Sequence, residues 1–198
     1  AMALRKQRFA HGAIDFDRQE MKFVIDEKGR PISVYTKESK EANKLIEEFM
    51  LLANRTVAET IGRVPKNRTP KPFVYRVHDN PDPEKMATLS EFVHRLGLKL
   101  KATGTRSEIT ASINQLLTQV HNTPEENLIS TLTIRTMAKA VYTTENIGHY
   151  GLAFDYYTHF TSPIRRYPDM MVHRLLERYL DKGRAVDSEE LEDRCKHS

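Results

Sequence analysis

The sequence predicts an α+β fold in which a small antiparallel sheet from the first 35 residues packs against a mainly helical body. Short β-prone runs occupy residues 12–35, apolar residues recur at spacings of three and four over 41–61, and helix-start signals recur through the middle of the chain. At 198 residues with 39% hydrophobic content, the chain is long enough for one compact domain. We therefore expect residues 1–198 to form a single unit.

Three runs near the N-terminus are predicted strands: 13–16, 21–25 and 32–35. The last two flank Glu27-Lys28-Gly29-Arg30, a turn signal, and should form a hairpin. A long amphipathic helix follows over 41–61 and ends at Gly62.

Residues 62–72 contain three prolines and four basic residues but no acidic one, which predicts a stiff basic loop. A short strand over 73–77 follows the loop. The basic stretch from Arg63 to Arg76 can neutralise the phosphates of a polyanionic ligand, or it can be an ordinary solvated loop.

The middle of the chain is predicted to be helical. Pro83 can begin a helix over 83–96, and the signals Ser107-Glu108 and Thr123-Pro124-Glu125 predict helices near 107–120 and 125–138.

The C-terminal third begins with a β-prone run at 141–143. Ser162 followed by Pro163 resembles a helix N-cap with proline at the first helical position, so a helix is expected over 163–181, with Pro168 able to delay or bend it. A last helix should cover 188–198.

Composition narrows the functional classes. The net charge of +4 is compatible with a polyanionic partner but does not require one. The single cysteine, Cys195, excludes an intramolecular disulfide framework, which fits a cytoplasmic protein, and no apolar run approaches the roughly 18 residues of a membrane span. No sequence motif of nucleotide-triphosphate, dinucleotide, serine-hydrolase or zinc sites occurs.

Residues 149–174 concentrate aromatic side chains, three histidines and three arginines around one predicted loop-to-helix junction. Arg165 and Arg166 would lie in the first helical turn, where cations are disfavoured by the helix dipole and an anion would be favoured. A guanidinium binds phosphate through two parallel hydrogen bonds, so this junction suits a phosphodiester. The alternative is that Arg165 pairs with Asp169 and Arg166 extends over the aromatic rings.

Asp169 and His173 are also one helical turn apart. The carboxylate can orient the imidazole as in a general-base pair, or the two can form an ordinary structural hydrogen bond. The spacing alone leaves both alternatives open.

The run Y-T-H-F-T-S-P-I-R-R-Y-P-D from Tyr157 to Asp169, with His173 four residues later, closely resembles the signature of the ribonuclease II family, which includes bacterial ribonuclease R. The resemblance extends to R-F-A-H-G-A-I-D-F-D at 8–17, E-K-G-R-P-I at 27–32 and the segment 37–54. It therefore covers most of the chain and identifies it as the C-terminal portion of the family's catalytic RNB domain, truncated at both ends.

The resemblance implies a processive, hydrolytic 3′-to-5′ exoribonuclease that degrades single-stranded RNA to nucleoside 5′-monophosphates. The family binds Mg²⁺ with an aspartate-rich motif that lies upstream of the segment seen here. No metal ligand or cofactor is therefore expected in this chain, which should be inactive alone. Its missing partners are the upstream half of the catalytic domain and the oligonucleotide-binding barrels.

Site residues follow from the same resemblance. Arg165 would be the catalytic arginine that holds the scissile phosphate, with Arg166 beside it. Phe16 would stack on a base, and Glu47 would contact the terminal nucleotide through its ribose hydroxyls. The other expected substrate-binding residues are Tyr157, His159, Ser162 and Tyr167. The alternative function is a single-stranded RNA-binding module that does not cleave.

Overall fold

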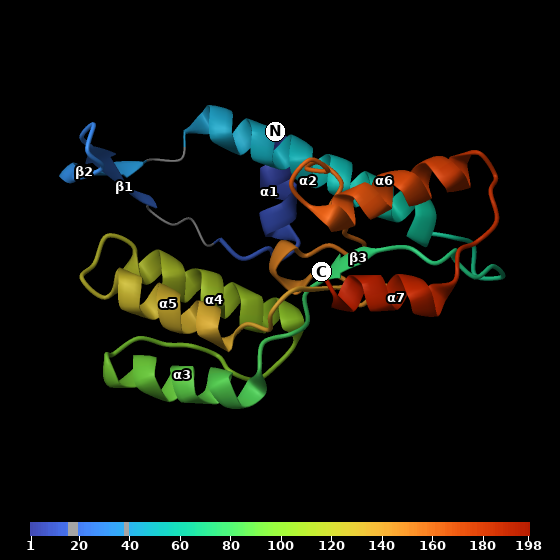
Figure 1. Ribbon diagram of the computed structural model, residues 1–198. Helices are drawn as coiled ribbons and strands as arrows, with labels where there is room; N and C mark the ends of the chain where they lie inside the picture. Colours follow the sequence, from blue (N-terminus) through green and yellow to red (C-terminus); the bar gives the residue numbers. More distant parts are fainter. Residues whose placement is uncertain (16–19, 38–39) are drawn as a thin grey trace.

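The computed structural model describes residues 1–15, 20–37 and 40–198. They form the α+β fold that the sequence predicts, with helices as the main component (Figure 1). The elements are α1 (Met2–Ala10), β1 (Glu20–Ile25), β2 (Pro31–Lys37), α2 (Glu41–Gly62), β3 (Tyr75–Val77), α3 (Pro83–Arg95), α4 (Arg106–Val120), α5 (Glu126–Thr136), β4 (Val141–Thr143), the 3₁₀ turn η1 (Tyr150–Leu152), α6 (Tyr167–Leu180) and α7 (Ser188–Lys196).

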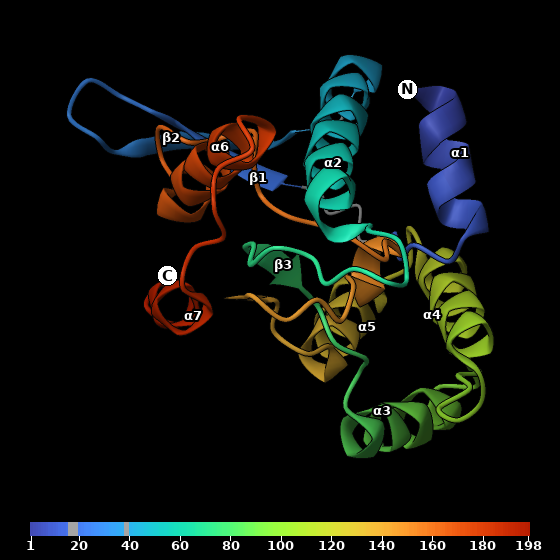
Figure 2. The ribbon, with the colours of Figure 1, turned by 90° about the vertical axis from the view of Figure 1, so that its right-hand side faces the viewer.

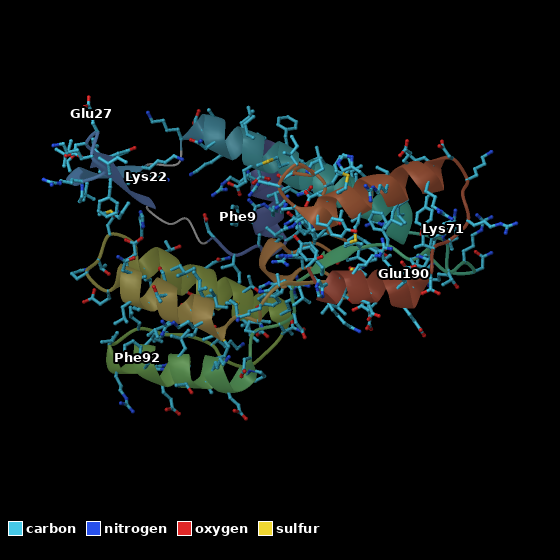
Figure 3. All side chains as sticks on the ribbon, viewed as in Figure 1. Phe9, Lys22, Glu27, Lys71, Phe92 and Glu190 are labelled. Carbon is cyan, nitrogen blue, oxygen red and sulfur yellow. The ribbon has the colours of Figure 1, made fainter. Side chains whose placement is uncertain are left out.

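The predicted hairpin is confirmed: β1 and β2 pair antiparallel, with Phe23 opposite Val34. The prediction that it packs against the helical body is wrong, because Phe23 and Ile32 remain 62% and 67% exposed. The hairpin lies at the edge of the molecule, where Lys22 and Glu27 are labelled in Figure 3. The first predicted strand is also wrong, since residues 13–15 have no regular structure and Phe16 lies outside the described residues.

A second two-stranded sheet lies in the centre of the fold. β3 pairs antiparallel with β4, Tyr75 opposite Thr143 and Val77 opposite Val141. The strand predicted over 73–77 therefore begins two residues later, although Phe73 and Val74 are fully buried.

Two hydrophobic clusters hold the fold together. One joins α2, β3, α6 and α7 through buried side chains that include Ala58, Val77, Val172 and Leu191. The other lies within the α3–α5 bundle, which is found below α2 in both ribbon views (Figures 1 and 2). Burial of such apolar area is the main favourable contribution to folding.

The predicted helices in the middle and at the C-terminal end are confirmed to within two residues at each end, except for α6. Their starts follow local chemistry: Asp82 caps α3 by accepting hydrogen bonds from the backbone of Glu84 and Lys85, and Thr105 forms a capping box with Glu108. Helix α1 was not predicted, because it is short and carries no N-cap side-chain bond. None of the helices in the described ranges has the length and hydropathy needed to cross a membrane.

Gly62 ends α2 for a reason that the sequence did not show. A Cβ at this position would lie 2.5 Å from the Tyr75 hydroxyl and 2.8 Å from the Tyr156 ring. The glycine therefore permits close packing of the helix end against Tyr75 of β3 and Tyr156, rather than a left-handed turn.

Candidate phosphate-binding site

The part of the signature run that precedes α6, residues 157–166, is the signature segment. It is fixed by hydrogen bonds to elements that are distant in the sequence. The Arg76 backbone N–H donates to the Tyr157 carbonyl at 2.9 Å, and the Thr158 hydroxyl donates to the Val74 carbonyl at 2.7 Å. These bonds tie an irregular segment to β3 and the residues before it. Its backbone is thereby held in place without a helix or strand of its own.

Asn54 on α2 is a second anchor. Its side-chain amide donates to the Tyr157 hydroxyl at 3.1 Å, and its amide oxygen accepts from the Phe160 backbone N–H at 2.9 Å. Asn54 is only 3% exposed, so both bonds are made away from water. Sequence reasoning missed this residue, because its partners are more than 100 residues away.

The helix predicted over 163–181 begins later, at Tyr167, with Arg166 as its N-cap residue. Ser162 is not the cap. Its carbonyl accepts the backbone N–H groups of Arg165 and Arg166 in a turn that precedes the helix, the arginine turn (residues 162–166). The physical reason is Pro168, whose ring would clash in a helix interior but is tolerated in the first turn.

Asp169 fixes this turn. Its side chain is fully buried, and Oδ1 accepts the Ser162 backbone N–H at 2.8 Å. Arg166 donates from Nε to Oδ2 at 2.8 Å and from Nη2 to Oδ1 at 2.9 Å, which is a two-bonded charge-assisted pair. The alternative in which Arg165 pairs with Asp169 is therefore wrong, because Asp169 binds the next arginine instead.

Arg165 is exposed on the same turn, and within the described part of the chain its side chain makes no hydrogen bond or ion pair. The backbone beneath it is fixed while its guanidinium remains available to a ligand. Of the two arginines, Arg165 is therefore the one that can grip a phosphate with all its donors.

Asp169 and His173 do not form the general-base pair considered from their spacing. His173 shares a 2.9 Å hydrogen bond with the Phe160 carbonyl and stacks on the Phe160 ring, with centroids 4.0 Å apart. Its role is to pack the signature segment against α6.

Tyr157 and His159 pack beside the arginine turn. The His159 ring shares a 2.7 Å hydrogen bond with the Tyr142 hydroxyl, and the Tyr157 ring lies 5.7 Å from it. Burial, followed by the charges of Arg166 and Arg76, lowers the pKa of His159 to about 4. The imidazole is therefore uncharged at neutral pH, and Tyr157, only 5% exposed, contributes packing.

The arginine turn opens on a hollow of about 630 Å³. Arg165, Arg166 and Tyr167 line one side of it, and α7 lines the other. Tyr167 is 51% exposed at the first position of α6, where its ring is accessible to a stacking partner.

Glu47 lies elsewhere. It lines a larger hollow of about 1360 Å³ beside α1 and approaches Arg8 at 3.5 Å, whereas its neighbour Glu48 is buried against Arg8 at 2.5 Å. The structure therefore places Arg165, Arg166 and Tyr167 at one hollow and Glu47 at another. Tyr157, His159 and Ser162 do not line the 630 Å³ hollow; they belong to the segment before α6 that supports the turn. Phe16 lies outside the described residues.

Comparison with known families decides the assignment, because the RNB domain matches residues 1–182. The chain belongs to the RNB domain family. Over 187 residues, this RNB chain is 43% identical to ribonuclease R of Aquifex aeolicus, covering 94% of this chain and 25% of that protein. It spans about a quarter of the length of the curated relatives it matches.

Solved structures carry the same RNB fold. The structure of Mycoplasma genitalium ribonuclease R in complex with ribose-methylated single-stranded RNA matches with a TM-score of 0.75 and 32% identity, over 98% of this chain and 29% of that one. A yeast pseudonuclease matches with a TM-score of 0.66 and 27% identity, over 81% of this chain and 20% of that one.

The Mg²⁺ implied by the family takes oxygen ligands, usually one or two carboxylates together with waters and substrate phosphates. Among the residues that the structure describes, no three His, Cys, Asp or Glu side chains are grouped so as to hold a metal ion. Asp169, the acidic group nearest the arginines, already accepts three hydrogen bonds. These residues do not fit a metal site, so no catalytic step through a metal is assigned to them.

Proposed function

We propose that this chain holds single-stranded RNA for a hydrolytic, processive 3′-to-5′ exoribonuclease, with Arg165 on the scissile phosphate. The observation that carries the proposal is that the two arginines are paired differently. Asp169 binds Arg166, whereas the exposed Arg165 remains available on a fixed turn. A guanidinium at a fixed position can stabilise charge that develops on a phosphate oxygen. The RNA complex of the related Mycoplasma genitalium ribonuclease R supports RNA as the ligand.

The other residues have supporting roles in this proposal. Arg166 lines the same hollow in a position fixed by Asp169, whose carboxylate balances its charge. Tyr167 offers an exposed ring to a base, and uncharged His159 shapes the wall behind the turn together with Tyr157. Ser162 sets the turn through its backbone.

Glu47 and Phe16 extend the proposal to the terminal nucleotide. The Glu47 carboxylate, on the side of α2 that faces the larger hollow, would accept hydrogen bonds from ribose hydroxyls. Phe16 would stack on a base. The two hollows would then bind different parts of one strand.

The complete enzyme would release nucleoside 5′-monophosphates, with Mg²⁺ held by aspartates outside the residues described. This chain would bind RNA and be inactive by itself. As a test, nucleoside 5′-monophosphate release with Mg²⁺ is compared between this chain and a protein extended by about 150 residues upstream. Activity only in the longer protein supports the proposal, and activity in this chain alone contradicts the assignment of the metal ligands.

Binding is tested separately by fluorescence anisotropy with a labelled oligoribonucleotide at low salt. Arg165→Ala should weaken binding about tenfold, because a charge-assisted contact is lost. The matched control is Arg174→Ala, which removes the same charge from an exposed position on α6 outside the 630 Å³ hollow. Equal effects of the two substitutions would contradict a specific role for Arg165.

The second candidate function is an RNA-binding module that does not cleave. The similarity to the yeast pseudonuclease favours it. Salt-dependent RNA binding without nucleotide release, even from the extended protein, would support this alternative over the nuclease.

A further inference from the structure

Helix α7 forms the second wall of the hollow at the arginine turn. Arg165 and Tyr167 line one side, and Glu190, Asp193, Arg194 and His197 line the other. The four residues of this second wall recur at spacings of three and four, so they share one face of the C-terminal helical segment. α7 lies beneath α6 in both ribbon views, and Figure 3 labels Glu190 on it (Figures 1 and 2).

The opposite face of α7 is anchored. Leu191 and Cys195 are 6% and 2% exposed in the hydrophobic core. Glu192 accepts hydrogen bonds from the Thr143 hydroxyl at 3.0 Å and from the Thr144 backbone N–H and hydroxyl at 2.7 and 2.8 Å. The wall that faces Arg165 is therefore held at a fixed position by the fold.

Arg194 is the cation of this wall. Its side chain is 50% exposed and pairs with Glu190 one turn earlier on the same helix. Arg194 and Tyr167 line the same hollow, so the guanidinium lies beside the first residue of α6. Glu190, and to a lesser extent Tyr167, raise the pKa of Arg194. Exposed ion pairs at this spacing are weak, so a phosphate oxygen can replace Glu190 as the partner.

We infer that Arg194 is a second phosphate-binding residue, which holds a neighbouring backbone phosphate of the same RNA strand across the hollow from Arg165. The inference rests on the proposed function, because it takes the ligand to be RNA. It also extends the site beyond residues 1–182, the part that the RNB domain matches. Arg165, on the arginine turn, would hold one phosphate. Arg194, on α7 and distant in the sequence, would hold the next.

The test is anisotropy of the wild-type chain and its variants with a fluorescein-labelled oligoribonucleotide of about twelve nucleotides over a range of salt concentrations. Arg194→Ala should weaken binding about fivefold. It should also lower the slope of log affinity against log salt by about 0.7, the value for one phosphate contact on a single strand. Glu190→Gln should tighten binding, because it removes the carboxylate that competes for Arg194.

The matched control is Lys196→Ala, which removes one charge from the same helix at a position that lines a different hollow. The inference would be overturned if the slope of log affinity against log salt were the same in Arg194→Ala and Lys196→Ala. It would also be overturned if Glu190→Gln bound the oligoribonucleotide more weakly than wild type. Circular dichroism of each variant separates a loss of binding from a loss of helix.

The outcome is distinguishable from failure of the proposed function. If Arg165→Ala weakens binding and Arg194→Ala does not, only the role of α7 is refuted. If the wild-type chain does not bind the oligoribonucleotide at low salt, the proposed function itself is refuted.

Discussion

The buried Asp169–Arg166 pair gives the sharpest prediction about this chain. In Asp169→Asn, the charge is lost and an amide donor replaces one of two carboxylate oxygens that accept from Arg166, at 2.8 and 2.9 Å. Removal of one partner from a buried pair costs about 3 to 5 kcal/mol. Because the Arg166 side chain retains 25% exposure and can be partly rehydrated, we expect about 3 kcal/mol.

The measurement is urea unfolding followed by circular dichroism. The control is Asp193→Asn, which removes the same charge from a side chain that is 79% exposed and pairs with Lys196 at 3.4 Å. That substitution should change the free energy of unfolding by less than about 0.5 kcal/mol. Equal stabilities of the two variants would refute the reasoning that burial of Asp169 fixes the turn.

Two further predictions concern the packing around the turn. Asn54→Leu should lower the free energy of unfolding by about 2 kcal/mol, because it leaves the Phe160 backbone N–H and the Tyr157 hydroxyl without their partner. A melting temperature unchanged from wild type would contradict this prediction. Burial, followed by the charges of His78 and Arg76, lowers the pKa of His149 from 6.5 to about 3. Below about pH 6.5 the unfolded chain therefore takes up a proton that the folded chain does not. As a result, the free energy of unfolding decreases as the pH falls toward 3. Urea unfolding should show that His149→Gln removes about 1.5 kcal/mol of the stability lost between about pH 6.5 and pH 5; an unchanged pH dependence would exclude this histidine as its source.

The exposed hairpin lies on a different surface from the proposed RNA site. Phe23, Ile25, Ile32 and Val34 are at least half exposed, and Phe49 on α2 is 51% exposed. The arginine turn, by contrast, combines a fixed backbone with an exposed cation, which is typical of a ligand site.

Much of the architecture was predictable from the sequence, because the signals act within a few residues. The spacing of apolar residues over 41–61 predicted α2, and the turn signal at 27–30 predicted the hairpin. Both depend on which side chains lie on one face of a local element. The sequence likewise determined family membership, through the signature around Arg165 and Arg166.

Only the tertiary structure decided which arginine is available. Spacing allowed Asp169 to pair with Arg165, but the fold buries Asp169 where the Arg166 fork reaches it. It also decided that Asn54 supports Tyr157, a residue 103 positions away, and that α7 faces the arginine turn. Local sequence patterns do not specify such contacts, because the distance between residues far apart in the chain is set by the packing of the whole core.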